Sequence, residues 1–213
     1  MNPYLEKLNG HLGNIQRAAE AEADPHRSRI LWNYLHHGAL ELGGDWERIF
    51  TPEMTIEEPR YEMAAGMEEP VILEGEAAVK DFYAAIEDEN LMLVDDGNHQ
   101  LFVNDEGLAE FATTVEFTTG EAILAEGLDA WFYRGVEIDD PDAHYVKTCR
   151  HAMFWPYTEE ARLVGEQVFQ IEAFEVSPID PEDVPTLAEV GEVAAQYYPE
   201  NVDGPSPFKS AGV

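Results

Sequence analysis

The sequence predicts an α+β fold in which a curved antiparallel sheet wraps around helices. Helical periodicity dominates residues 1–42, whereas several later segments alternate apolar and polar residues as strands do. One further helix is expected near residues 75–86, between the first strand candidate and the others, so helices and strands do not follow one another in regular alternation. Segregated strands and helices favour an α+β plan, because strict alternation would instead indicate a parallel sheet.

Two helices are expected at the start of the chain. Residues 1–24 form a helical N-terminal extension, whose apolar residues recur at helical spacing: Leu5, Leu8, Leu12 and Ile15. Asp24-Pro25 then provides an N-cap followed by proline at the first helical position, which is a start signal for a second helix. Gly43-Gly44 ends that helix after about Leu42.

The sheet is expected between residues 54 and 174. Pro59 demotes the first strand, residues 54–61, to a sheet edge or a bend. Residues 62–74 are predicted to be a loop, and residues 121–142 fit either a strand or a lid. The other predicted strands are residues 98–104, 108–118, 143–155 and 163–174.

Three regions are therefore expected. They are the helical extension, residues 1–24, the α+β domain, residues 25–177, and a C-terminal helix with an irregular tail, residues 178–213. Thr186 and Glu189 fit a capping box for the C-terminal helix.

The composition excludes several classes of function. The chain of 213 residues carries a formal net charge of −32, which disfavours nucleic acid and anionic membrane surfaces as partners. No apolar run is long enough to span a membrane and no secretory signal is visible, so we expect a cytoplasmic protein. The single cysteine, Cys149, excludes an internal disulfide framework and a cysteine-built zinc site.

The second helix carries the most informative pattern. Ile30, Tyr34, His37 and Glu41 fall on one narrow arc of that helix, beside leucines. Burying an imidazole and a carboxyl is unfavourable unless each is paired or faces a wet cavity. The stripe therefore predicts a pocket whose catalytic residues are Tyr34, His37 and Glu41, although a solvated helix edge would also explain His37 and Glu41 taken singly.

Further candidates lie on the predicted strands. Glu58 is in phase with Met54, so it is a fourth catalytic candidate unless Pro59 breaks the register. Arg60 is a substrate-binding candidate, and a surface ion pair of Glu58 with Arg60 is the alternative.

The remaining substrate-binding candidates are Asp96, His99, His151 and Trp155. A turn at Asp95-Asp96-Gly97 also explains the first of these, and His151 could equally balance buried carboxylates or lie at an interface. No His-x-x-x-His or His-x-x-Glu-His spacing is present, so we expect no metal site.

Three segments resemble the SnoaL-like branch of the nuclear-transport-factor-2-like superfamily. They are residues 46–57 after the long helix, Leu73-Glu74-Gly75 with the helix that follows, and the strand–turn–strand of residues 96–109. With the last two strands, the likeness covers roughly residues 26–175. It implies a conical α+β barrel, in which a strongly bent sheet encloses an apolar cavity closed by helices.

The resemblance also implies a function. Enzymes of this superfamily, among them scytalone dehydratase, dehydrochlorinase, ketosteroid isomerase and lyases of lignin-derived diaryl compounds, mostly need no cofactor. The dehydratases and dehydrochlorinases have a catalytic histidine just before the asparagine of the third segment, but here Gly97 precedes Asn98 and His99 follows it. The helix acid of that pair corresponds to Glu41.

The combined expectation is a cofactor-independent lyase that eliminates water, halide or formaldehyde from a small hydrophobic, aromatic compound. Glu41 or His37 would remove a proton, and Tyr34 with Arg60 or His99 would hold the developing oxyanion. An isomerase or cyclase is the nearest alternative, and a non-catalytic ligand-binding or assembly module of the same fold is the second. Family analogy suggests a homodimer or homotrimer.

Overall fold

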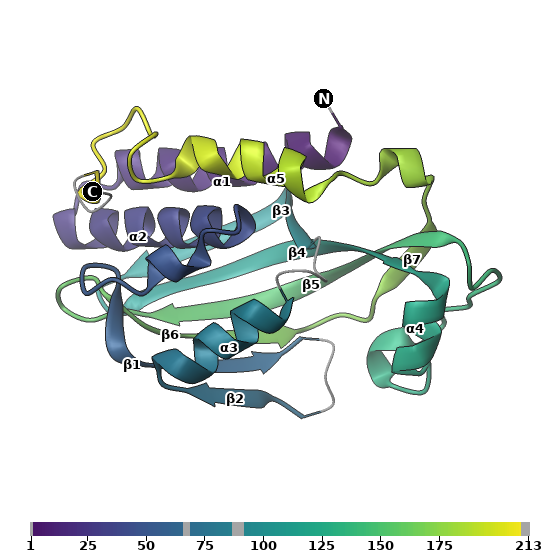
Figure 1. The fold of residues 1–213 in the computed structure, drawn as a ribbon. Coiled ribbons are helices and arrows are strands. Elements are labelled where there is room, and N and C mark those ends of the chain that lie inside the picture. Colours follow the sequence, from purple (N-terminus) through teal and green to yellow (C-terminus); the bar gives the residue numbers. More distant parts are fainter. Residues whose placement is uncertain (1, 66–68, 87–91, 210–213) are drawn as a thin grey trace.

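The computed structural model describes residues 2–65, 69–86 and 92–209. Three helices lie together over one face of the sheet: α1 (Pro3–Ala21), α2 (Pro25–Leu42) and α5 (Leu187–Ala194) (Figure 1). A fourth, α3 (Glu76–Ile86), packs against the first two strands, and a short fifth, α4 (Gly120–Glu126), follows the fourth strand. The chain is thus an α+β protein, as the sequence predicts.

The described residues form one sheet of seven strands. They are β1 (Thr55–Ala64), β2 (Val71–Glu74), β3 (Met92–Asn104), β4 (Gly107–Thr119), β5 (His144–Pro156), β6 (Leu163–Gln170) and β7 (Glu175–Pro178). Their order is β2-β1-β6-β5-β4-β3, and β7 pairs with β5 beyond the end of β6. All pairs are antiparallel except β1 with β6. The sheet is curved and open, with β2 and β3 at its edges and helices over one of its faces (Figure 1), as the sequence predicts.

The predicted start and stop signals of α2 act as expected. The Asp24 side chain accepts hydrogen bonds from the backbone nitrogens of His26 (2.9 Å) and Arg27 (3.1 Å), and Pro25 is the first helical residue. Gly43 forms the C-cap. The capping box of α5 is also present, since Thr186 and Glu189 satisfy each other's backbone nitrogens.

The sequence analysis is wrong in three places in the sheet. β2 lies within the segment expected to be a loop, and β7 follows the last predicted strand, residues 163–174, where no further strand was expected. β1 has neighbours on both sides and is not an edge, although its pairing with β6 shifts register between Thr55 and Arg60, around Pro59. The ambiguous residues 121–142 contain most of α4 and a 3-10 turn, Trp131–Tyr133, and no strand among them.

A large irregular bulge distorts β3. Asp95 pairs with Thr113 and Gln100 with Phe111, so four residues of β3 stand opposite the single residue between those partners on β4. Extra residues of this kind re-aim the side chains beside them. His99 lies in the bulge, and this position turns its imidazole toward the interior.

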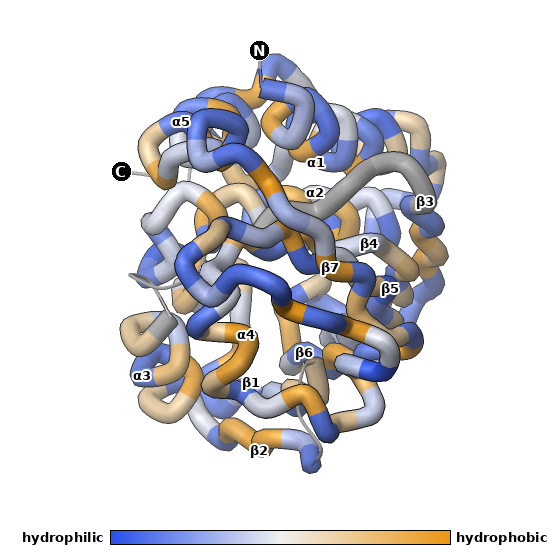
Figure 2. The backbone as a smooth tube through the Cα atoms, turned by 90° about the vertical axis from the view of Figure 1, so that its right-hand side faces the viewer, coloured by the Kyte–Doolittle hydropathy of each residue, from blue (hydrophilic) through white to orange (hydrophobic). Residues whose placement is uncertain are grey.

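The main core is a layer of apolar side chains between the helices and the sheet, and a smaller cluster lies around α4 and the Trp131–Tyr133 turn. α1 belongs to the main core, because Leu8, Leu12 and Ile15 are almost completely buried against the same core as α2 and β3. Figure 2, viewed at 90° to Figure 1, also shows α1, α2 and α5 gathered at one end, opposite β2 and α3. No helix among the described residues is long and apolar enough to cross a bilayer.

Candidate functional site

A cavity of about 330 Å³ lies between the helical layer and the sheet. This volume falls at the lower end of the range for small-molecule sites. Much of its wall is apolar, and several ionisable side chains interrupt that wall. The ionisable lining residues are His11, Tyr34, Glu41, Glu110, Glu116, Glu126, Lys147, His151 and Glu166.

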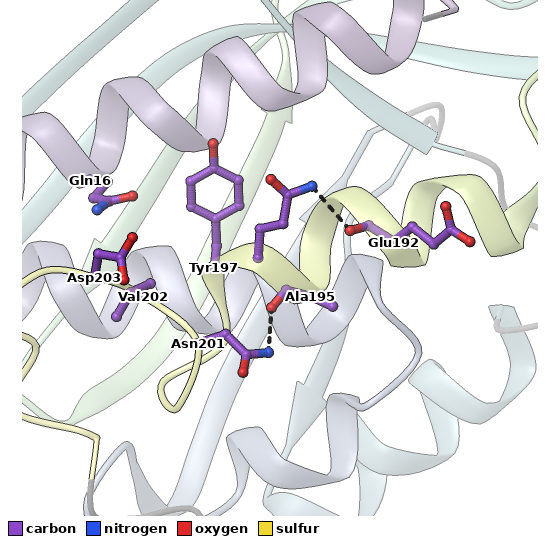
Figure 3. A pocket seen from close by; sticks show the side chains of 8 residues that line it. Gln16, Glu192, Ala195, Tyr197, Asn201, Val202 and Asp203 are labelled. Carbon is purple, nitrogen blue, oxygen red and sulfur yellow. Dashed lines mark hydrogen bonds between the residues drawn. The ribbon is translucent and has the colours of Figure 1, made fainter.

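A second hollow of about 510 Å³ opens on the surface between α1 and the C-terminal segment (Figure 3). Its polar groups are used locally, since the Asn201 amide donates to the Ala195 carbonyl (2.8 Å) and the Gln196 amide donates to the Glu192 carbonyl (3.2 Å). Tyr197 donates its hydroxyl proton to Asn9. This open, internally satisfied surface offers no acid–base pair, so the enclosed cavity is the candidate site.

The stripe predicted on α2 faces the interior. Tyr34 is 5% exposed and His37 is fully buried, while Glu41 is half-buried and lines the cavity with Tyr34. His37 lies one layer behind, in edge contact with the Trp155 ring (centroids 4.9 Å apart). The pocket-facing orientation expected for this helix is therefore confirmed, whereas the catalytic roles of its residues stay predictions.

His37, Tyr83 and Glu41 form a short network at the end of α2. The His37 Nε2 lies 3.1 Å from the Tyr83 hydroxyl and 3.6 Å from a Glu41 carboxylate oxygen. Tyr83 also donates to Glu41, at 3.4 Å. Burial and the nearby Glu41 charge raise the pKa of Tyr83 well above its usual value, so Tyr83 remains a donor. The network fixes the orientation of the Glu41 carboxylate at the cavity wall.

Glu110, on β4, is a fully buried carboxyl group at the other side of the cavity. The Tyr34 hydroxyl donates to its Oε2. His99 Nε2 lies 2.5 Å and His11 Nε2 3.8 Å from its Oε1. Burial would raise the pKa of Glu110, but the nearby His11 and His99 and the Tyr34 hydroxyl outweigh it and hold that pKa below its usual value.

Glu166, on β6, lies in the opposite kind of environment. It is 7% exposed, and Tyr34, Tyr61 and Tyr157 lie close enough to interact with it electrostatically. Burial, followed by the negative charges of Glu41 and Glu110, raises its pKa well above the usual range. The cavity therefore contains one carboxyl group that favours the neutral form, close to others that carry charge.

A basic group closes the end of the cavity below α4. Lys147 is 3% exposed, and its ammonium lies 3.0 Å from Glu116 and 3.4 Å from Glu126. It also donates to Tyr133 (3.3 Å) and lies 4.8 Å from the centre of the Phe174 ring. This buried charge is thus fully compensated by side chains of the protein, as buried charges must be.

His151 and Trp155, both predicted to bind substrate, line the cavity from β5. His151 Nδ1 lies 3.0 Å from the Thr114 hydroxyl, and burial lowers the pKa of His151 to about 4, so the imidazole is neutral. Trp155 packs against Tyr34 with ring centroids 4.8 Å apart. Its buried indole nitrogen has no hydrogen-bond partner among the described residues and is therefore a donor available to a ligand.

Other predicted site residues are not brought to this cavity. Glu58 is exposed beside Gly75, and Arg60 is exposed in an ion pair with Glu62 (3.1 Å). The cavity-facing orientation of Glu58 was wrong because the register shift at Pro59 turns its side chain to the outer surface. The side chain of Asp96 lies outside the described residues.

Sequence reasoning missed six of the ionisable residues that line the cavity in the described part of the chain, namely His11, Glu110, Glu116, Glu126, Lys147 and Glu166. Glu110 stands in phase with Leu108 and Ala112 on β4, and Glu166 with Val168 on β6. An acidic residue on the face of a strand that otherwise carries apolar side chains is therefore a signal that could have identified both. His11 likewise occupies the apolar stripe of α1, but nothing local in the sequence indicates that it meets Glu110.

No family model matches the chain, and no curated protein matches it. Among solved structures, it is similar to a candidate polyketide cyclase from Xanthomonas campestris pv. campestris, with 16% identity over 68% of this chain and 91% of that chain (TM-score 0.44). It is also similar to the epoxide hydrolase/cyclase-like enzyme SalBIII, with 13% identity over 72% and 95% (TM-score 0.39). A phenazine biosynthesis-related protein from Pseudomonas aeruginosa gives 10% identity over 85% and 97% (TM-score 0.36).

These likenesses are too low to carry an argument about fold or activity. The fold class rests on the strands and helices described above, and the superfamily membership stays a prediction.

Proposed function

We propose that this protein is an enzyme that performs acid–base elimination on a small, largely apolar, ring-bearing compound inside the cavity. The observation that carries the proposal is a pair of carboxyl groups, Glu41 and Glu166, that line one cavity in contrasting environments. Environments that separate the pKa values of two such groups assign one the role of acid and the other the role of base.

Glu166 is the proton donor in this scheme. A carboxyl group that burial keeps neutral can donate a hydrogen bond and then its proton at neutral pH, where an ordinary glutamate would be ionised. Its position on β6, in the layer of side chains beneath the helices, gives it a fixed direction into the cavity.

Glu41 is the base. Its side chain is 29% exposed and keeps contact with solvent, and the Tyr83 hydroxyl and the His37 imidazole hold it in place. Its contact with solvent gives the proton that it takes from the substrate a route out of the cavity. His37, which does not line the cavity, is assigned a positioning role in place of direct proton transfer.

The elimination balances with these two groups. Glu41 takes a proton from a carbon atom of the substrate, the electron pair of that C–H bond forms a new C=C bond, and the neighbouring C–O bond breaks. Glu166 gives its proton to the departing oxygen, so that water or an alcohol leaves. Proton exchange through solvent then returns Glu41 to the carboxylate and Glu166 to the acid.

The lining indicates the class of substrate. Leu12, Ile15, Phe82 and Val168 offer apolar surface, and the unpartnered Trp155 nitrogen can donate to a single substrate oxygen. A compact aromatic or alicyclic compound with one or two oxygens matches this combination. A purely ligand-binding module would be better served by a wall without paired carboxyl groups, because burying them is unfavourable.

The test is a screen of the purified protein against hydroxylated aromatic and alicyclic compounds, with product mass as the readout. We expect loss of a small molecule from a substrate, and a drop of at least about 100-fold in kcat for Glu41→Gln and for Glu166→Gln. Glu57→Gln, which removes an exposed acid from β1, is the matched control and should retain activity.

Other outcomes would redirect the proposal. A product of unchanged mass would make the enzyme an isomerase or a cyclase that uses the same two carboxyl groups. Full activity in both glutamine variants would exclude this acid–base pair, and ligand binding without turnover across the screen would favour the binding module.

A further inference from the structure

A second cluster lies apart from the proposed acid–base pair. His11 comes from α1, His99 from the bulge of β3 and Glu110 from β4, and each offers one ligand atom within 4.8 Å of the other two. His11 and Glu110 are buried and both line the cavity, and the His99 side chain is 6% exposed. Three elements distant in the sequence thus converge on one point of the cavity wall.

The spacing of the donor atoms suits a metal ion. Ligand atoms about 2.1 Å from one ion, at tetrahedral or octahedral angles, lie roughly 3.0–3.4 Å from one another. The Oε1 of Glu110 lies 2.5 Å from His99 Nε2 and 3.8 Å from His11 Nε2, on either side of that range. Small side-chain rotations would therefore place all three atoms around a single ion.

The directions of these groups are an independent indication. His99 Nε2 and Glu110 Oε1 lie only 2.5 Å apart as an ion pair, and neither atom has a well-directed hydrogen-bond partner among the described residues. A buried acceptor and a buried ring nitrogen left in this way usually have a further partner. A metal ion shared by the imidazole nitrogen and the carboxylate oxygen would satisfy both atoms.

Electrostatics favour a cation at this point. Glu110 is fully buried, and a carboxylate in that position requires compensating charge. The Tyr34 hydroxyl donates to its Oε2, which leaves Oε1 for a ligand bond and resembles the outer contacts that orient metal-binding carboxylates.

We propose that His11, His99 and Glu110 bind one divalent transition-metal ion, such as Zn²⁺, in the wall of the cavity. Two imidazoles with one carboxylate form a ligand set of the type used by zinc and non-haem iron, and three protein ligands leave further coordination positions open. These positions face the cavity, so a bound ion would contact any molecule held there. The inference stands apart from the proposed function, because Glu41 and Glu166 are not among the ligands.

The test measures binding, and it needs no substrate. The full chain is stripped with a chelator and titrated with Zn²⁺ in an excess of Mg²⁺ and salt, which suppress loose binding to a surface of charge −32. Bound zinc is measured by elemental analysis, and affinity by competition with a chelating dye. Circular dichroism confirms that each variant is folded.

We expect one tightly held zinc ion per chain. His11→Ala and His99→Ala should each weaken binding by more than about 100-fold, whereas Tyr34→Phe, which removes only an outer contact, should weaken it by about 10–100-fold. His26→Ala is the matched control, because it removes an exposed imidazole that contacts the Asp105 carbonyl. Its affinity should equal that of the unmodified chain.

The Co²⁺ form of the unmodified chain gives a second readout that does not depend on variants folding. Strong ligand-field absorption, typical of a four- or five-coordinate ion, would support the site, and a weak spectrum of a fully hydrated ion would overturn it. Equal zinc affinity in His99→Ala and the unmodified chain would also overturn it, and would leave a His99–Glu110 ion pair as the explanation of the contact.

Discussion

Replacing Glu166 by glutamine should make the protein more stable as it makes the proposed enzyme inactive. Burial raises the pKa of Glu166 well above 4.5, so the native state keeps a proton that the unfolded chain loses above pH 4.5. The contribution of this group to stability is therefore fully present below pH 4.5 and is lost as the pH rises toward the native pKa. Glutamine has no such dependence.

The size of this stability change follows from the difference in proton binding between the folded and the unfolded chain. Each pH unit above 4.5 through which native Glu166 stays neutral lowers the free energy of unfolding of the unmodified chain by about 1.4 kcal/mol. The stability of Glu166→Gln relative to the unmodified chain should rise by that amount per unit and level off at the native pKa. Glutamine also retains the shape of the side chain, so packing changes little.

The assay is urea unfolding at a series of pH values, with Glu57→Gln as the exposed matched control. Effects of every other titrating group cancel in the difference between two chains that share them. A stability difference for Glu166→Gln that does not change with pH would refute the reasoning, because it would show that Glu166 ionises as readily in the folded protein as in the unfolded one.

Three further changes test other parts of the account. Burial lowers the pKa of His36 to about 4, so between pH 6.5 and 4 the unfolded chain binds a proton at this histidine that the folded chain does not bind. Over that range the free energy of unfolding of the unmodified chain should therefore fall by about 3 kcal/mol relative to that of His36→Gln. A β-carbon at Gly165 would lie 1.9 Å from the Arg60 carbonyl oxygen, so Gly165→Ala should destabilise the β1–β6 pair by about 1–3 kcal/mol in urea unfolding. Trp155→Phe keeps the ring packing but removes the unpartnered donor, so it should raise KM by roughly 10-fold for an oxygen-bearing substrate, and an unchanged KM would exclude that contact.

Local signals in the sequence were enough to predict α1, α2, α3 and α5, but not the short α4, whose residues fitted either a strand or a lid. Asp24-Pro25, Gly43 and the Thr186 capping box act within a few residues, so their effects do not depend on the rest of the fold. The inward stripe of α2 was also predictable, because its period is fixed by helix geometry.

The features that the sequence did not predict depend on contacts between residues far apart in the chain. The sequence could not reveal that Glu58 turns outward, since the register shift in β1 arises from its pairing with β6. Nor could spacing reveal the cluster of His11, His99 and Glu110, because α1 and the bulge of β3 bring these side chains together only in the folded chain. Glu110 and Glu166 were detectable in principle as acids in the apolar phase of a strand.

Infrared spectroscopy of the folded protein at neutral pH tests the central claim most directly, because it reports whether Glu166 carries a proton. In heavy water, the unmodified chain should show the carbonyl stretch of a protonated carboxyl group, and Glu166→Gln should lack that band. Identical spectra for the two chains in this region would contradict the account, since Glu166 would then be charged and unable to act as the acid.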